Sequence, residues 1–159
     1  MFRGQVKCSG WTGGVVGNVY NLVTVEDCSA SNFVQNNCTE DGSTVGGIVG
    51  GAGGVNVNRC FARNVISKPK ANQYKGSIVG KTNRTDLSTS ITNCTYWTDI
   101  NADVIEHYEN TPTQSGNVNY WDEGKTDKGE STMLGDATKS ILGRENWYYF
   151  SDEIGRAHV

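Results

Sequence analysis

The sequence lacks the signals of several common protein classes. No apolar run approaches the ~20 residues of a membrane-spanning helix, so we expect no membrane contact within this chain. No stretch of useful length places its apolar residues at the helical period, and the best helical candidate is the short segment 136–142. Proline occurs only twice, and the opening residues lack the apolar core of a secretory signal peptide. These absences argue against a helical or membrane-spanning fold.

The motifs of several kinds of site are also missing. No C-x-x-C pair occurs among the five cysteines, which argues against a zinc or dithiol site. The glycine-rich segment 43–54 lacks the Gly-Lys-Ser/Thr end of a phosphate-binding loop and is followed by a strand pattern. H-E-x-x-H is absent, and the acidic segment 122–130 has neither the EF-hand order nor the calcium-binding nonapeptide. We therefore expect no cofactor and no metal.

Charge is low but unevenly distributed along the chain. The net charge is −3, too small to imply a nucleic-acid partner. Residues 1–100 carry nine Lys/Arg against six Asp/Glu, whereas residues 101–159 carry five against eleven. Because the acidic residues are scattered, a solvated surface explains them better than a cation site. The composition changes near residues 96–101, which predicts a boundary there.

The length and the two ends suggest a single domain or part of a larger one. The chain has 159 residues. Its last six residues, IGRAHV, match one reading frame of a common sequencing adapter, so we set residues 154–159 aside from fold and function. His107 is then the only native histidine.

What the sequence does contain is a repeat. Twenty glycines separate many short Val/Ile runs, a pattern typical of short strands and tight turns. TGGVVG at 12–17, VGGIVG at 45–50 and KGSIVG at 75–80 share one pattern. Each is followed by a strand-like segment that ends in a cysteine. The repeat positions are Gly14, Gly17, Gly47, Gly50, Gly76, Gly80, Cys28, Cys60 and Cys94.

A repeat of about 30 residues predicts stacked layers of chain, because one unit cannot bury its own apolar face. We expect Val16, Val49 and Val79 to lie in one column. Val15, Ile48 and Ile78 would form a column on the other side of the strand if both faces are covered, and the three repeat cysteines a third column. The predicted fold is all-β, a right-handed parallel β-solenoid of about three coils over residues 4–100. Residues 101–153 would form an irregular acidic, aromatic-rich cap or linker.

The segment VGGIVGGAGGVNVNRCFARNV resembles the GLUG repeat, whose pattern is a Gly-Gly-Leu/Ile-Val-Gly strand followed by a strand ending Asn-Cys-Tyr-Ala. The resemblance covers roughly residues 6–97, departs at Ser77, and lacks the aromatic residue after Cys28. It implies a stalk of a large bacterial secreted or cell-surface protein, such as an adhesin or an immunoglobulin-A-cleaving metallopeptidase. A host protein or a glycan is then the implied partner.

Two other functions stay open beside this non-enzymatic one. The chain could belong to a carbohydrate-active β-helix enzyme, with acidic side chains such as Asp86, Asp99, Asp103, Asp122 and Asp127 on one lateral face. It could also be the non-catalytic stalk of a secreted peptidase. His107 lies between Glu106 and Glu109, but a surface histidine is the better interpretation. Aromatic residues of the last third could contact a ligand or cover the end of the stack, and the candidates are Trp97, Tyr120, Trp121 and Trp147.

Overall fold

The computed structural model describes residues 4–8, 10–30, 32–38, 41–67, 73–98, 103–119, 147–150 and 153–156. All regular elements in these residues are β-strands, and none is a helix. Two sheets have six strands each and a third has three. Every strand pair in these three sheets is parallel. The predicted all-β class with parallel sheets is therefore confirmed.

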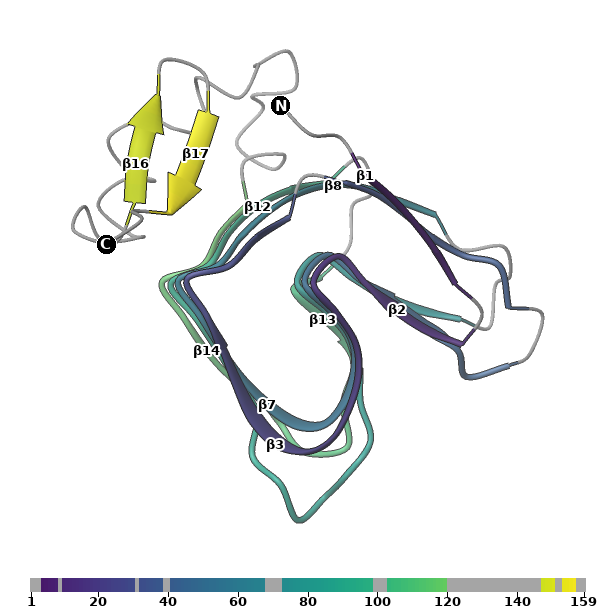
Figure 1. The fold of residues 1–159 in the computed structure, drawn as a ribbon. Helices are drawn as coiled ribbons and strands as arrows, with labels where there is room; N and C mark the ends of the chain where they lie inside the picture. The colour runs from purple at the N-terminus through teal and green to yellow at the C-terminus, as the bar shows by residue number, and fades with distance from the viewer. Residues whose placement is uncertain are drawn as a thin grey trace.

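The first six-stranded sheet forms the outer arc in Figure 1. It contains β1 (Gly4–Cys8), β4 (Ser29–Ala30), β5 (Asn32–Asn36), β8 (Phe61–Ser67), β12 (Thr95–Thr98) and β15 (Val118–Asn119).

The second six-stranded sheet curls through the lower half of Figure 1. It contains β3 (Val16–Glu26), β7 (Val49–Asn58), β10 (Val79–Thr82), β11 (Ser90–Thr92), β13 (Ile105–His107) and β14 (Thr113–Ser115). The three-stranded sheet lies between the arc and the curl, and consists of β2 (Trp11–Gly13), β6 (Thr44–Gly46) and β9 (Tyr74–Gly76). Separately, β16 (Trp147–Phe150) and β17 (Glu153–Arg156) form an antiparallel pair that includes residues 154–156.

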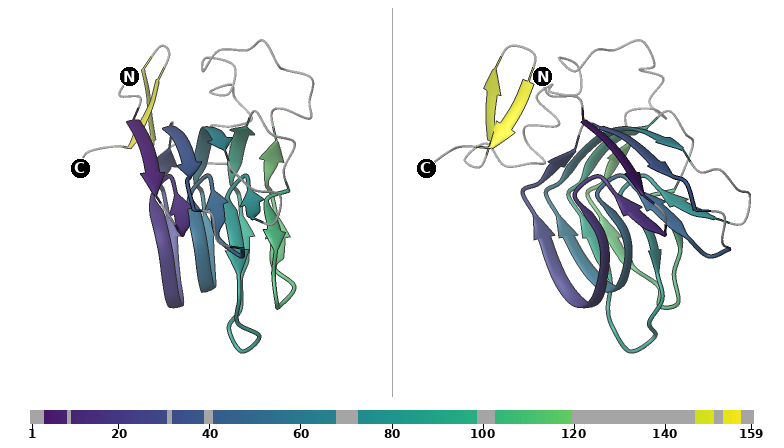
Figure 2. Two further views of the ribbon diagram at one scale, coloured as in Figure 1. Left: turned by 90° about the vertical axis from the view of Figure 1, so that its right-hand side faces the viewer. Right: turned by 45° about the vertical axis from the view of Figure 1, so that its right-hand side comes forward.

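The chain passes three times through all three sheets, and within the described residues a fourth pass contributes strands only to the two larger sheets. We call these passes layer 1 (residues 11–36), layer 2 (44–67), layer 3 (74–98) and layer 4 (105–119). The layers lie side by side in chain order, from purple to green in the left view of Figure 2, and overlap when viewed along the stack in Figure 1. The pairing of β13, β14 and β15 with layer 3 carries the sheets past residue 100. The architecture is β-helix-like.

The strand registers match the alignment of the sequence repeats. Val16 pairs with Val49, Val49 with Val79, and Val79 with Ile105 of layer 4. In layers 2 and 3 both faces of this segment are covered, because Ile48, Val49, Ile78 and Val79 are all fully buried. Val15 of layer 1 is 43% exposed. At the position of Val15, Ile48 and Ile78, the side chain is therefore fully buried in layers 2 and 3 but exposed in layer 1.

The glycine motif forms a tight bend between the three-stranded sheet and the curled sheet. Gly13, Gly46 and Gly76 lie in register. A Cβ atom on any of them would come well within 3.0 Å of the carbonyl oxygen three residues later. Only glycine allows the chain to fold back so closely. The segment at 43–54 is thus a structural bend, not a phosphate loop or a linker.

The layers differ most where β3, β7 and β10–β11 round the bottom of the curl. Layer 1 has a register shift between Val19 and Leu22. In layer 3 the segment 83–89 loops out beyond the other layers (Figure 1) and joins β10 to β11. The ion pair between Arg84 and Asp86 lies in this loop. These insertions lengthen the spacing between the glycine motif and the cysteine in layers 1 and 3. The strand residues on either side of each insertion still pair with the equivalent residues of layer 2.

Candidate functional site

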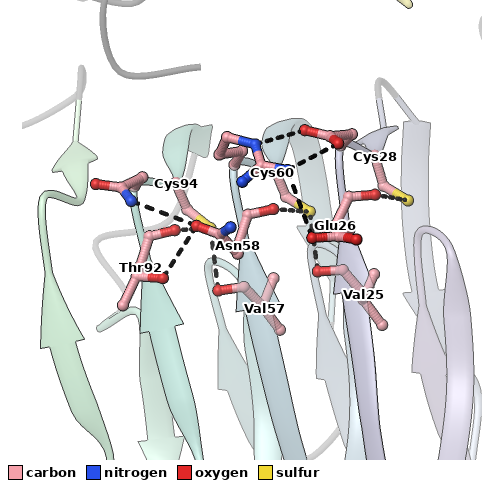
Figure 3. A network of polar contacts seen from close by, with 11 residues as sticks. Val25, Glu26, Cys28, Val57, Asn58, Cys60, Thr92 and Cys94 are labelled. Atoms are coloured by element: carbon pink, nitrogen blue, oxygen red, sulfur yellow. Dashed lines mark hydrogen bonds and ion pairs between the residues drawn. The ribbon is translucent and has the colours of Figure 1, made fainter. Parts of the chain in front are cut away.

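The corner between the curled sheet and the outer arc contains a network of polar contacts (Figure 3). In each layer the residue at the corner has a positive φ: 53° at Asp27, 50° at Arg59, 53° at Asn93 and 66° at Gly116. Asp, Asn and Gly adopt this left-handed conformation most readily. The column of left-handed residues turns every layer at the same place.

The repeat cysteines directly follow this corner. Each thiol donates a weak hydrogen bond to the carbonyl two residues earlier, at 3.2 Å for Cys28 and 3.4 Å for both Cys60 and Cys94. Cys60 also contacts the Val25 carbonyl of layer 1 at 3.6 Å, and Cys94 contacts the Val57 carbonyl of layer 2 at 3.9 Å. The column therefore links each layer to the one before it (Figure 3).

Asn117 takes the position of the cysteine in layer 4. Its Nδ2 donates to the carbonyl of Ile91 at 2.8 Å. Ile91 lies three residues before Cys94, just as Val57, which contacts Cys94, lies three residues before Cys60. The Oδ1 of Asn117 accepts from the backbone N–H of Cys94 at 2.9 Å. An amide makes stronger hydrogen bonds than a thiol. Asn117 thus performs the same interlayer contact and satisfies a backbone donor that layer 4 does not otherwise cover.

The column cysteines differ in their exposure to solvent. Cys28 is half-buried, whereas Cys60 and Cys94 are fully buried thiols that form no disulfide. The pKa of Cys60 is raised far above its ordinary value, mainly by its contact with the Cys94 side chain and secondly by burial. Since the thiolate is the reactive form, Cys60 is a poor nucleophile and metal ligand. Among the described residues, no three His, Cys, Asp or Glu side chains form a group suited to a metal ion.

Acidic side chains at the corner are bound by an arginine. Arg59 Nε and Nη2 donate to the two carboxylate oxygens of Asp27 at 2.8 and 2.9 Å, and Nη2 also contacts Glu26 at 3.4 Å. Asp27 is buried, so the bidentate pair neutralises a carboxylate that water cannot solvate well. This pairing also holds Arg59 in its left-handed conformation. Of the other acidic candidates, Asp99, Asp122 and Asp127 lie outside the described residues.

A second cluster lies at the layer 4 end of the three-stranded sheet. The rings of Tyr74 and His107 stack at 4.3 Å, and Lys81 Nζ lies 4.9 Å from the Tyr74 ring. His107 Nε2 is 3.2 Å from Glu109. The Glu106 carboxylate accepts a hydrogen bond from the backbone N–H of Lys75. Glu106 and His107 thus contact residues of β9, which is the last strand of the three-stranded sheet within the described residues.

The predicted repeat glycines fall into three columns, because Gly76 does not share the position of Gly14 and Gly47. Gly17, Gly50 and Gly80 each directly follow the paired valines of β3, β7 and β10. Gly76 pairs with Gly46, so Gly14 and Gly47 correspond to Ser77. Of the candidate ligand-contact aromatics, Tyr120 and Trp121 lie outside the described residues. The structure describes only the backbone of Trp97, in β12, and of Trp147, in β16.

The corner column and layer 4 were not identified from sequence. The residue before each cysteine is Asp27, Arg59 or Asn93, and this variety conceals a shared conformation. Layer 4 keeps neither the glycine motif nor the cysteine, since Ile105 and Asn117 replace the valine and the thiol. Its DVIE and SGNV segments could have been aligned with SIVG and TNCT only by side-chain role.

Comparison of the chain with protein-family models, with curated proteins and with solved structures gives no match. In the described part of the chain, no helix has the length and apolar character to cross a membrane.

Proposed function

We propose that this chain is part of a right-handed parallel β-solenoid that serves as a rigid stalk, with an adhesive lateral surface, in a large bacterial extracellular protein. The observation that carries the proposal is the unbroken register of Val16, Val49, Val79 and Ile105 across four layers. A stack in which each layer contacts only its neighbours extends along one axis. Such a structure suits a spacer better than an enclosed binding pocket.

Rigidity is supported by continuous interlayer contacts at both the bend and the corner. At the bend, the backbone N–H groups of Val16, Val49 and Val79 donate to carbonyl oxygens of the next layer, at 3.0, 2.9 and 3.0 Å. At the corner, thiols and amides join the same layers. Because these bonds run along the stack, bending it would strain many of them together.

The resemblance to GLUG repeats supports the extracellular location and the adhesive role, since it implies surface or secreted proteins. In this proposal Asn117 and Glu106 begin the cap of the stack, because their side chains satisfy backbone donors of layer 3. Free, buried thiols are compatible with this role because they pack as small apolar residues.

Single-molecule stretching of the full chain from its two ends tests the stalk. We expect layers to detach one after another, in steps of about 110 Å, since each contains about 30 residues of up to about 3.6 Å. Duplicating residues 51–80 directly after Gly80 should add one layer and therefore one further step.

A duplicated segment that extends without resisting force would overturn the proposed stack. Release of new reducing ends from polysaccharides by the purified chain would overturn its non-catalytic character.

A further inference from the structure

The outward face of the curled sheet next to the corner carries two columns of short polar side chains. We call this surface the polar face. The registers align the first column as Thr24, Asn56, Ser90 and Thr113, and the second as Glu26, Asn58, Thr92 and Ser115. Between the columns, Val25, Val57 and Ile91 point inward and are buried. Seven of these eight polar residues are uncharged, which is unusual for an exposed protein surface.

Hydrogen bonds between layers hold the central side chains of the polar face in place. Ser90 Oγ donates to Asn56 Oδ1 at 2.8 Å, and Thr92 Oγ1 donates to Asn58 Oδ1 at 3.1 Å. These four side chains are half-buried, whereas Thr24 and Thr113 at the ends of the first column are exposed. Side chains that are already ordered lose little entropy when they bind a ligand.

The polar face repeats in two directions. Adjacent layers are about 4.8 Å apart, and alternate residues of one strand are about 6.6 Å apart. Each layer presents the same kind of pair, two polar side chains that in most layers carry hydroxyl or amide groups. A ligand that also repeats can make the same contacts with several layers, and linked contacts add to its avidity.

Charge selects among repeating ligands. Glu26 is the only charged member of the two columns, and it lies 3.4 Å from Arg59, which also binds Asp27. The polar face therefore has no positive charge of its own to attract a nucleic acid, a sulfated glycan or an anionic lipid surface. Its amides and hydroxyls both donate and accept hydrogen bonds, as sugar hydroxyls do.

We propose that the polar face binds a neutral linear polysaccharide, whose hydroxyl groups hydrogen-bond to the two columns across successive layers. This assignment rests on the adhesive part of the proposed function and names its surface and ligand class.

The experiment measures retention of the full chain on insoluble cellulose and chitin, with heparin as the charged comparison. The variant Thr24→Lys/Thr113→Lys places two long cations at exposed ends of one column. The control variant Asn83→Lys/Thr85→Lys adds the same charge at exposed positions of the 83–89 loop. We expect retention on at least one neutral polysaccharide, about tenfold weaker binding for the first variant, and unchanged binding for the control.

Three results would overturn the assignment: no retention on either neutral polymer, equal loss in both variants, or adsorption to heparin alone. Circular dichroism of both variants establishes that they fold. Failure of the assignment is distinguishable from failure of the stalk, because the stretching steps of the unmodified chain depend on the layers and not on the polar face.

Discussion

Substitution of equivalent glycines tests how the layers constrain one another. Gly17 and Gly50 occupy the same repeat position in layers 1 and 2, and neither has a positive φ. A Cβ at Gly50 would lie 2.5 Å from the Gly17 carbonyl oxygen and 2.6 Å from two backbone atoms of Thr12. A Cβ at Gly17 would meet only the Trp11 carbonyl oxygen, at 3.0 Å. Alanine should therefore be tolerated at Gly17 but not at Gly50.

The difference can be expressed as a free energy. To bring the added methyl group to ordinary van der Waals contact at 3.4–4 Å, the backbone of the Gly50→Ala variant would have to move away from layer 1 by about 1 Å. Overpacking of this kind costs about 1–3 kcal/mol, and each ladder hydrogen bond that lengthens costs about 1 kcal/mol more. We expect Gly50→Ala to lower the unfolding free energy by about 3 kcal/mol. For Gly17→Ala, the small contact is offset by reduced entropy of the unfolded chain, so the change stays within about 1 kcal/mol.

Urea unfolding followed by circular dichroism measures both variants. With a slope of about 2 kcal/mol/M, the midpoint of Gly50→Ala should fall by about 1.5 M and that of Gly17→Ala by less than about 0.5 M. Equal shifts for the two variants would refute the reasoning, because they would mean that layer 1 does not limit the space beside Gly50.

The remaining predictions concern the corner. In urea unfolding, Arg59→Met should lower the unfolding free energy by about 2 kcal/mol, because it leaves the buried carboxylate of Asp27 unpaired. Arg84→Met, which removes an exposed ion pair, should have no measurable effect. Equal effects of the two substitutions would contradict the role given to the Arg59–Asp27 pair. Iodoacetamide should label Cys28 faster than Cys60, as peptide mass spectrometry would measure, and equal rates would refute the assigned burial. Because folding raises the pKa of Cys60, the protonated thiol contributes to stability below pH 9.0, and this contribution is lost as the pH rises further. Cys60→Ala should therefore make the midpoint of urea unfolding less dependent on pH. Asn117→Ala should cost about 1–2 kcal/mol and speed hydrogen exchange of the backbone amide of residue 94, and unchanged exchange would exclude the cap.

The repeat in the sequence was sufficient to predict an all-β fold with parallel pairing. The glycine motif recurs in layers 1 to 3 because each of these layers makes the same tight bend, where a Cβ at Gly13, Gly46 or Gly76 would clash with the backbone. Val49 and Val79 recur because each fills the same interior column. Where a repeated structure needs one residue type, the need is visible in the sequence.

Equivalence in sequence does not extend to equivalence in surroundings. Gly17 and Gly50 look alike along the chain, but only at Gly50 does another layer occupy the space where a Cβ would lie. Arg59 occupies a corner position that suits Asp, Asn or Gly, and an ion pair to Asp27 in another layer holds it there.

The sequence by itself determined the bend, the strand registers and the buried columns, because these depend on local backbone sterics and on one apolar residue in each repeat. Only the tertiary structure decided the polar face, the role of Asn117 and the fourth layer. In those features, side chains of different types make equivalent hydrogen bonds in adjacent layers. The sequence does not reveal this, because a hydrogen bond requires a donor and an acceptor but not one particular amino acid.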